Sequence, residues 1–379
     1  MKIVYIVESL VSRGGCERII TEKANYLADK FGYDISIIVC SQHPEQQNAF
    51  RLSSSVKQIN LGLPLYSQYQ YKYPMRLWIK MTTLTKLRES ISDCIRAINP
   101  DIMIGMGHFK ANLICSIDCR AKKIIECHEA RFFTQSGLAN HQNRLSKLFT
   151  KFNRLFYFHT IEKKADIVVT LTEGDKRLWN KAKRVEVIPN FSNLEVSNIS
   201  LCNSKRIIAV GRLSWEKGYD RLIKIWERVI KGNQDWHLDI YGEGDLEGNL
   251  NEIIKRRKIK NIQILPTTNN ISQEYSNSSI CVMTSYFEGF ALVLLEALKH
   301  GVPCIAFDCP FGPASIIKNS QCGFIIKNGD TGQFAEKLSL LIHNDEMRKE
   351  FSNNSIKRAE EFAIDTIMKK WMILFESLL

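Results

Sequence analysis

The fold class of this chain is decided by one stretch, ICVMTSYFEGFALVLLEALKHGVPCIAFD, at residues 280–308. Two short runs in it, residues 280–285 and 302–308, are mostly apolar and have the length of buried strands. Between them, residues 290–301 form a longer apolar run that ends at Gly301, as helices commonly do. A strand, a helix and a second strand in this order predict a parallel βαβ unit.

The same alternation of short and long apolar runs continues along the rest of the chain. We expect strands at residues 2–9, 34–40, 101–106, 122–129, 165–172, 185–190, 205–212, 236–244, 262–266, 280–285, 302–308 and 322–327. We expect helices at residues 14–32, 74–98, 140–164, 220–232, 250–258, 271–278, 290–301 and within 331–379. This rhythm predicts the α/β class, with two doubly wound, Rossmann-like domains built on mainly parallel sheets.

A polar segment, FSNLEVSNISLCNS at residues 191–204, interrupts the rhythm and is the expected linker. We therefore expect an N-terminal domain at residues 1–193, a C-terminal domain at 204–360 and a helix at 361–379 that packs back on the N-terminal domain. Ligands of such sheets bind beyond the carboxyl ends of the strands. The two domains are therefore expected to face each other across a ligand cleft.

The composition is that of a folded protein, with 45% hydrophobic and 24% charged residues. The first residues lack the features of a signal peptide, and no apolar run approaches the length of a membrane span. The eleven cysteines are scattered without a CxxC pair, which is typical of reduced thiols. The sequence therefore predicts a cytoplasmic protein.

The net charge of +12 is placed unevenly, since residues 1–200 hold 29 Lys and Arg against 18 Asp and Glu. This excess favours an anionic partner for the first half of the chain. Two segments, residues 71–88 and 143–158, mix basic residues with Leu, Phe, Trp and Tyr at helical spacing. Such helices either lie on an anionic membrane surface, here the inner face of the cell membrane, or pack on their own domain.

Two carboxylates, Glu288 and Glu296, flank the start of the helix in the opening stretch. Glu288 follows a strand, and Gly289 permits a tight turn into a helix that is expected to begin near Phe290. The first amides of that helix lack internal partners and favour an anion. Glu296 lies two turns further on, where a carboxylate in an apolar run needs a polar ligand or contact with water.

Two further loops follow strands and carry residues suited to phosphate. In IIAVGRLSWEKG, residues 207–218, Arg212 and Lys217 place a guanidinium and an ammonium in one loop, and together they suit a diphosphate. In VESLVSRGGCERII, residues 7–20, Gly15 permits a close backbone approach to a ligand, although the motif is not GxGxxG. Taken singly, each loop is equally an ordinary basic or glycine turn.

Taken together, these motifs resemble those of the retaining glycosyltransferases of family 4, which have the GT-B fold. Glu288 and Glu296, with seven residues between them, match the EX7E motif of that family. The resemblance is strongest at residues 205–330 and rests on motifs in the expected order: GGCER, VIPN, GRLSWEKG, EGFALVLLEAL and DCPFGP. The variant DCPFGP is most similar to a subgroup that builds bacterial surface polysaccharides and oligosaccharides from UDP-sugars.

The resemblance implies a role for each residue of the C-terminal motifs. Glu296 would hold the ribose hydroxyls of the nucleotide, and Glu288 would lie near the hydroxyls of the donor sugar. Arg212 and Lys217 would bind the diphosphate and stabilise charge as UDP leaves. The backbone amides that would help them are those around Phe290, Ala291 and Leu292.

The resemblance also implies roles outside those motifs. The base of the nucleotide would lie near Gly242 and Leu265, at the ends of their strands. In the first domain, Gly15 would approach the phosphate or the sugar. His128, in IIECHEARF, would contact the donor sugar, although a lone His is equally a capping or packing residue.

Two positions depart from the family pattern. The family usually has an acid where GPASII has Ser315, and any role of that acid is therefore in doubt. The second Gly of the frequent EGFG is Ala291 here. We expect an ordinary helical backbone at Ala291, which would make this substitution of little consequence.

The expected activity is retaining transfer of a hexose or N-acetylhexosamine from a UDP-sugar to a saccharide or lipid-linked saccharide. The chain has no Asp-x-Asp motif, so Arg212, Lys217 and the helix N-terminus are expected to replace a metal, with no cofactor beyond the donor. The alternatives are a sugar-nucleotide epimerase or hydrolase and a non-catalytic subunit that binds a nucleotide sugar. A nucleic-acid partner is not expected, because the strongest motifs lie in the neutral half.

Overall fold

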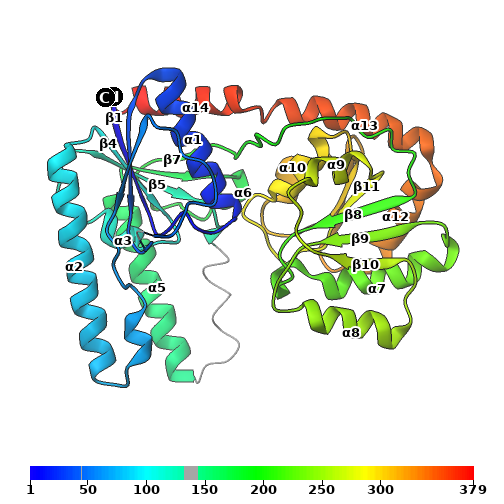
Figure 1. Cartoon of the computed structure of the whole chain (residues 1–379), viewed down its shortest axis with the longest axis horizontal. Helices are drawn as coiled ribbons and strands as arrows, with labels where there is room; N and C mark the ends of the chain where they lie inside the picture. Colours follow the sequence, from blue (N-terminus) through cyan, green and yellow to red (C-terminus); the bar gives the residue numbers. More distant parts are fainter. Residues whose placement is uncertain (44, 132–143) are drawn as a thin grey trace. The chain divides into compact units, whose positions relative to one another are not determined.

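The structure is a computed structural model that describes residues 1–43, 45–131 and 144–379. Contacts within the chain divide it into two compact units, each built around one sheet (Figure 1). The N-terminal unit comprises Met1–Ile188 and Met368–Leu379, and the C-terminal unit comprises Pro189–Ile367.

The sheet of the N-terminal unit has seven strands in the order β3-β2-β1-β4-β5-β6-β7, and all neighbouring strands are parallel. The strands are β1 (Lys2–Val7), β2 (Asp34–Val39), β3 (Val56–Asn60), β4 (Ile102–Met106), β5 (Lys122–Cys127), β6 (Ile167–Thr170) and β7 (Val185–Val187). The sequence does not predict β3, because VKQIN is short and polar, as edge strands often are.

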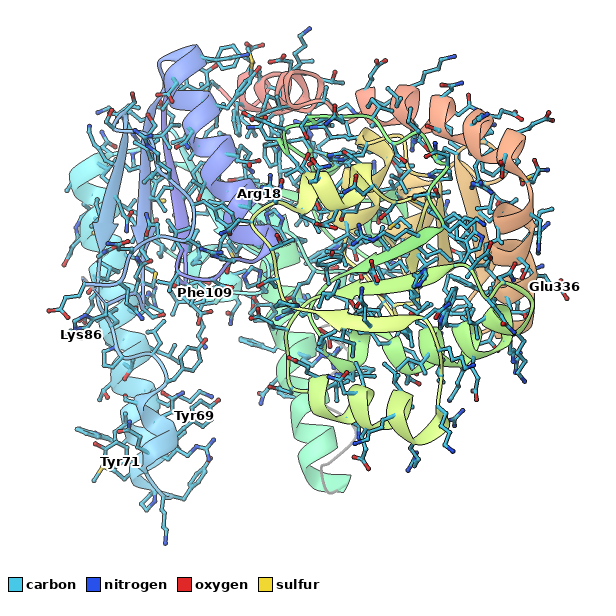
Figure 2. The ribbon with its side chains drawn as sticks, turned by 45° about the vertical axis from the view of Figure 1, so that its right-hand side comes forward. Arg18, Tyr69, Tyr71, Lys86, Phe109 and Glu336 are labelled. Carbon is cyan, nitrogen blue, oxygen red and sulfur yellow. The ribbon has the colours of Figure 1, made fainter. Side chains whose placement is uncertain are left out.

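The helices of the N-terminal unit connect these parallel strands. They are α1 (Gly15–Phe31), η1 (Ser67–Gln70), α2 (Met75–Ile98), α3 (Ala111–Ile114), α5 (Arg144–Lys164) and α6 (Glu173–Lys176). Of the helix predicted at 140–164, residues 140–143 lie outside the described residues. Figure 2 shows Tyr69 and Tyr71 at the end of α2 that lies away from the sheet.

The end of the chain contributes to the N-terminal unit through α14 (Ile364–Glu376). The ring of Trp371 in this helix lies 3.8 Å from the Nζ atom of Lys23 in α1. Lys23 is fully buried and also forms an ion pair with Glu126 of β5. This helix is therefore held by a buried charge as well as by apolar packing.

The sheet of the C-terminal unit has six parallel strands in the order β10-β9-β8-β11-β12-β13. The strands are β8 (Arg206–Val210), β9 (His237–Tyr241), β10 (Ile262–Leu265), β11 (Ile280–Met283), β12 (Cys304–Asp308) and β13 (Gly323–Lys327). When the strands are numbered from one within each unit, six adjacent strands of each sheet have the doubly wound order 3-2-1-4-5-6. The N-terminal sheet adds a seventh strand after them. The predicted fold class is therefore confirmed.

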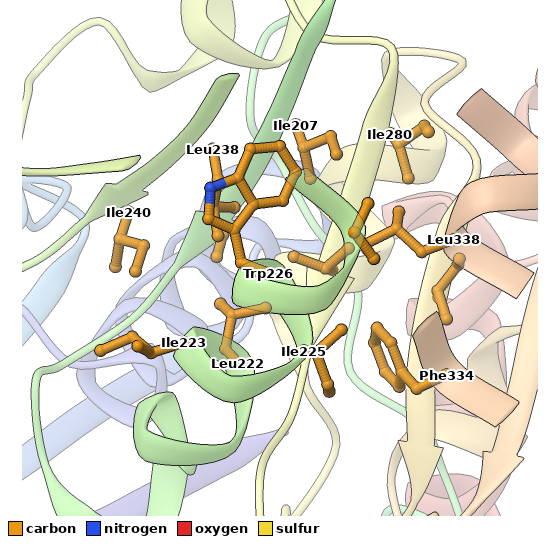
Figure 3. Close-up of a cluster of buried hydrophobic side chains, with 14 of the residues drawn as sticks. Ile207, Leu222, Ile223, Ile225, Trp226, Leu238, Ile240, Ile280, Phe334 and Leu338 are labelled. Carbon is orange, nitrogen blue, oxygen red and sulfur yellow. The ribbon is translucent and has the colours of Figure 1, made fainter. Parts of the chain in front are cut away.

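The core of the C-terminal unit forms where helices cover this sheet. The helices are η2 (Trp215–Lys217), α7 (Tyr219–Val229), η3 (Ile230–Gly232), α8 (Glu247–Arg257), α9 (Ile271–Ser276), α10 (Leu292–Lys299), α11 (Pro313–Ile316), α12 (Thr331–His343) and α13 (Asp345–Glu360). In Figure 3, Trp226 of α7 lies among Ile207 and Leu238 of the sheet and Leu222 of its own helix. Burial of these side chains fixes α7, and with it the loop that precedes it.

The polar segment predicted as a linker lies in the C-terminal unit and is held there by hydrogen bonds. The Nζ atom of Lys299 in α10 donates to the carbonyl oxygens of Ser192 (2.9 Å) and Leu194 (2.7 Å). The amide of Ser200 donates to the carbonyl oxygen of His300 at 2.8 Å. The segment therefore follows a defined path along α10.

Candidate functional site

The candidate site is built at the carboxyl ends of β8 and β11, which are neighbours at the switch point of the C-terminal sheet. The loop after β8 carries Arg212 and Lys217, and the loop after β11 carries Glu288. The Thr284 hydroxyl, on the second loop, donates to the carbonyl oxygen of Gly218 at 2.9 Å and joins the two loops. Side chains that are far apart in sequence are thus brought to the edge where such sheets bind ligands.

Lys217 and Glu288 form an ion pair, with the Lys217 Nζ atom 2.8 Å from Glu288 Oε1. The same carboxylate oxygen accepts a hydrogen bond of 2.6 Å from the Ser285 hydroxyl. Glu288 is 9% exposed, so its carboxylate is partly shielded from water and depends on these two partners. An ammonium group has three N–H donors, which leaves Lys217 able to bind an anion while it keeps Glu288.

The main chain of Glu288 is fixed by the DCPFGP loop that follows β12. The Glu288 amide donates to the carbonyl oxygen of Pro310 at 2.9 Å, and the Phe311 amide donates to the carbonyl oxygen of Glu288 at 3.0 Å. Ser315, where the family usually has an acid, lies in α11, and its hydroxyl donates to the Phe311 carbonyl oxygen at 3.4 Å. This motif therefore supports the position of Glu288 through backbone contacts.

Arg212 extends into solvent, with 81% of its side chain exposed, in contrast to Lys217. Its Nη2 atom lies 3.6 Å from Glu216 Oε1, a separation typical of a loose surface ion pair. A guanidinium held this weakly can turn toward a diphosphate at little energetic cost, because it leaves almost no interaction behind.

The helix after Glu288 begins at Leu292, two residues later than predicted. Ala291 precedes it with φ 62° and ψ 58°, a left-handed conformation that glycine adopts far more readily than alanine. The expectation of an ordinary helical backbone at Ala291 is therefore wrong. The second glycine of the family pattern EGFG falls at this left-handed position. Alanine in its place therefore puts strain on the backbone.

Glu296 is the fifth residue of α10, just over one turn from its start, and is 8% exposed. The Tyr275 hydroxyl donates to its Oε2 atom at 3.3 Å. Burial, and then the Glu296 carboxylate, raise the pKa of Tyr275, so the phenol stays protonated and acts as the donor. The side chain in the apolar run thus has a protein partner that the sequence did not reveal.

Gly242 and Leu265 are brought beside the β8 loop by the sheet. The Gly242 amide donates to the Leu265 carbonyl oxygen at 2.9 Å, and the Gly211 amide donates to the Tyr241 carbonyl oxygen at 3.0 Å. A Cβ atom added at Gly242 would lie 2.0 Å from the Gly211 carbonyl oxygen, so only glycine fits. The ends of β8, β9 and β10 thus form one continuous backbone edge.

In the N-terminal unit, Gly15 is the first residue of α1, and His128 follows β5. The His128 side chain is 5% exposed, and its Nε2 atom lies 3.3 Å from Glu126 Oε1. Burial alone would raise the pKa of Glu126, but Lys23 and His128 outweigh it and lower that pKa to about 2. For Lys23, burial dominates and lowers the pKa.

Three residues close to these motifs were not predicted from the sequence. Ser285 and Tyr275 hold the two motif carboxylates, and His108 follows β4 at the edge that also carries His128. Desolvation, and then His128, lower the pKa of His108 to about 4. The available signal was their position at the carboxyl end of a predicted strand, because Ser285 ends the strand predicted at 280–285 and His108 lies two residues after the one predicted at 101–106.

The two basic segments differ in how much of them packs on the N-terminal unit. In α2, Leu87, Ile91 and Ile95 are buried, whereas residues 71–78 are all exposed. Of the second segment, residue 143 lies outside the described residues, and Phe152, Leu155 and Phe156 of α5 are exposed. In the described part of the chain, no helix is both long and apolar enough to cross a membrane.

A pocket of about 560 Å³ lies beside these helices in the N-terminal unit. Its walls combine basic side chains, apolar side chains and hydroxyl groups from α2, α5 and the α3 region. They include Arg88, Lys163, Lys164, Leu84, Phe156 and Ser116. This lining suits an anionic ligand with an apolar part.

Comparisons with known proteins agree with this geometry. Residues 196–358 match the family described as Glycosyl transferases group 1. The chain is 29% identical to an uncharacterized glycosyltransferase of Haemophilus influenzae and 27% identical to the amylovoran biosynthesis glycosyltransferase AmsD of Erwinia amylovora, in each case over 98% of both chains. It is 25% identical, over 99% of this chain and 98% of the other, to a Campylobacter jejuni GalNAc-alpha-(1->4)-GalNAc-alpha-(1->3)-diNAcBac-PP-undecaprenol alpha-1,4-N-acetyl-D-galactosaminyltransferase.

Solved structures show the same fold. The crystal structure of Anabaena HepE in complex with UDP and glucose matches all of this chain and all of its own, with a TM-score of 0.71 at 16% identity. The family match includes Lys217, Glu288 and Glu296. This chain is therefore a glycosyltransferase with the GT-B fold, and its residues 196–358 belong to glycosyl transferases group 1, that is, glycosyltransferase family 4.

Proposed function

We propose that the chain transfers a hexose or N-acetylhexosamine, with retention, from a UDP-sugar to a saccharide or lipid-linked saccharide in bacterial polysaccharide biosynthesis. The observation that carries the proposal is the Lys217–Glu288 ion pair (2.8 Å), which lies at the carboxyl ends of β8 and β11 with Arg212 on the same loop. Two cations beside a fixed carboxylate suit a ligand that has both a diphosphate and sugar hydroxyls.

The donor is proposed to bind along the edge of the C-terminal sheet. Glu296 would accept hydrogen bonds from the ribose hydroxyls, and Lys217 and Arg212 would bind the diphosphate. The base would lie against the backbone at Gly242 and Leu265. The amides around Phe290, Ala291 and Leu292, at the start of α10, would add donors to the phosphate oxygens.

In the N-terminal unit, Gly15 and His128 are proposed to contribute to donor binding. Gly15 begins a helix of 17 residues, and its amide lies among those that lack a partner within the helix. Among the described residues, neither ring nitrogen of His128 makes a well-aligned hydrogen bond, although the side chain is buried and Nε2 lies 3.3 Å from Glu126 Oε1. A buried imidazole in this state suits a sugar hydroxyl, which can both donate and accept.

In the proposed reaction, the bond between the anomeric carbon and the diphosphate oxygen breaks while the acceptor oxygen attacks from the same face. The acceptor proton passes to the departing phosphate oxygen, and the electron pair of the broken bond leaves with UDP. Lys217 and Arg212 would stabilise the charge that develops on UDP. Loss of one such donor typically slows a reaction about 10²–10³-fold.

The acceptor is proposed to bind in the N-terminal unit. The pocket lined by Arg88, Lys163 and Lys164 suits a negatively charged acceptor, and Leu84 and Phe156 add apolar contact. The names of two relatives support this class of acceptor, since one acts in amylovoran biosynthesis and the other on an undecaprenol-linked saccharide.

A thermal-shift series with UDP, GDP, ADP and their sugar conjugates tests the donor, because a ligand of the folded state raises apparent stability as ln(1 + [L]/Kd). We expect stabilisation by UDP and more by one UDP-sugar. Product analysis with that donor should then show sugar transfer only when an acceptor is added, with activity retained in EDTA. Rapid turnover without acceptor would instead indicate an epimerase or hydrolase, and loss of activity restored by Mg²⁺ or Mn²⁺ would overturn the metal-free mechanism.

A further inference from the structure

The two ends of α2 have opposite surroundings. Toward its end, Leu87, Ile91 and Ile95 are buried against the N-terminal unit. Around its start, residues 71–78 are all exposed, and the Arg76 guanidinium lies 4.7 Å from the centre of the Tyr69 ring. Figure 2 shows Tyr69 and Tyr71 at this end, away from the sheet. We refer to residues 66–81 as the α2 tip.

The α2 tip exposes large apolar side chains at a density that is unusual for a water-facing surface. Trp78 is 63% exposed, Met81 62% and Tyr73 74%. The other exposed apolar residues of the tip are Tyr66, Tyr69, Tyr71, Met75 and Leu77. Single exposed apolar residues are common, but eight within sixteen positions indicate a surface that another body covers.

The charge of the α2 tip indicates which kind of partner covers it. From residue 46 to residue 88 the chain contains no Asp or Glu. Lys72, Arg76 and Lys80 are exposed in the tip among the aromatic residues. A second copy of the same tip would bring like charges together, whereas anionic phospholipid headgroups would neutralise them.

We propose that the α2 tip docks the N-terminal unit on an anionic phospholipid bilayer. Trp and Tyr favour the boundary between headgroups and acyl chains, and Lys and Arg bind the headgroups. A helix that lies flat on a membrane exposes one apolar stripe. Here consecutive residues from Tyr71 to Trp78 are exposed, so the end of the helix enters the interface.

Vesicle co-sedimentation of the full chain tests this proposal. Vesicles of phosphatidylcholine with phosphatidylglycerol should bind the chain, and vesicles of phosphatidylcholine alone should bind it at least tenfold more weakly. The triple variant Tyr73→Ser/Trp78→Ser/Met81→Ser should lower the partition coefficient at least tenfold. The triple variant Lys72→Gln/Arg76→Gln/Lys80→Gln should lower it and flatten its dependence on salt.

The matched control is Ile373→Ser, which removes an exposed apolar side chain from α14, far from the tip in sequence. This variant should bind vesicles as the unchanged chain does. Circular dichroism and thermal unfolding of each variant verify that it folds. Equal vesicle binding by the unchanged chain and the apolar triple variant would overturn the proposal. So would a concentration-dependent dimer that the same variant abolishes, because a second copy would then cover the tip.

Discussion

Two ion pairs of the same chemistry, Lys23–Glu126 and Lys217–Glu288, lie in sheets of the same topology but in different surroundings. The first is sealed, with side-chain exposures of 0% and 1%, and Trp371 covers the ammonium. The second lies at a strand edge with exposures of 22% and 10%. A buried pair of this kind stabilises the fold, whereas a pair that is open to solvent on one side can also bind a ligand.

Because the two pairs differ in solvent exposure, the free-energy cost of removing one partner differs between them. Removing one partner of a sealed pair leaves a charge that water cannot reach, and the folded state loses that energy in full. Removing one partner of the open pair lets water replace part of the interaction. The comparison therefore predicts a large loss of stability for the first pair and a large loss of activity for the second.

Lys23→Met should produce the largest effect on stability. It leaves the Glu126 carboxylate buried without its ammonium, and the free energy of opening of the N-terminal unit should fall by about 3–5 kcal/mol. Hydrogen exchange of the α1 amides measures this energy. Lys30→Met, which is exposed on the same helix, is the matched control and should change it by less than about 1 kcal/mol. If Lys23→Met lowers this free energy by less than about 1 kcal/mol, the Lys23–Glu126 pair does not stabilise the N-terminal unit.

Lys217→Met should lower activity strongly and stability only slightly. We expect kcat to fall about 10²–10³-fold because charge on the leaving UDP is no longer stabilised. Hydrogen exchange in α7 should change by no more than about 1 kcal/mol. Lys224→Met, exposed in α7, should keep full activity. A kcat within twofold of the unchanged chain would remove Lys217 from the proposed chemistry.

Glu296→Gln extends the comparison to a third buried carboxylate, which contacts the phenol of Tyr275. It tests whether this carboxylate binds the ribose of UDP. The amide keeps the size of the side chain and its contact with Tyr275 but weakens hydrogen bonds from the ribose hydroxyls. The Kd for UDP, measured by calorimetry, should rise about 10–100-fold. Inorganic diphosphate, which has no ribose, should bind equally well to both proteins. An unchanged Kd for UDP would refute the ribose role.

Ala291→Gly should have the smallest effect and the opposite sign. Glycine relieves the left-handed backbone before α10, and stability should rise by about 0.4–1 kcal/mol. Ala297→Gly, inside the same helix, should instead lower stability by about 0.5–1 kcal/mol or more. Thermal unfolding of the two variants shows the contrast. A stability loss in Ala291→Gly would indicate that the alanine side chain contributes packing that outweighs the strain.

The sequence predicted the order of strands and helices well, because hydrophobic periodicity reports local structure directly. It missed β3, which is short and half polar, and it began α10 at Phe290 because the left-handed turn at Ala291 leaves no mark in composition. The motif carboxylates were found from their spacing and from the family resemblance.

Their partners were not found, because contacts between distant residues follow from tertiary structure. Lys217 and Glu288 are 71 positions apart and meet only because β8 and β11 are neighbours. Lys23 lies in a helix segment, TEKANYLAD, whose pattern resembles a solvated face. Its burial depends on β5 and α14, which are far away in the chain.

The most direct test of the open pair as a donor site is a crystal structure of the chain with UDP. We predict that Lys217 Nζ and the Arg212 guanidinium both lie within hydrogen-bond distance of diphosphate oxygens. We also predict that Glu296 accepts hydrogen bonds from the ribose. UDP bound elsewhere, without contact to Lys217, Arg212 or Glu296, would contradict this prediction.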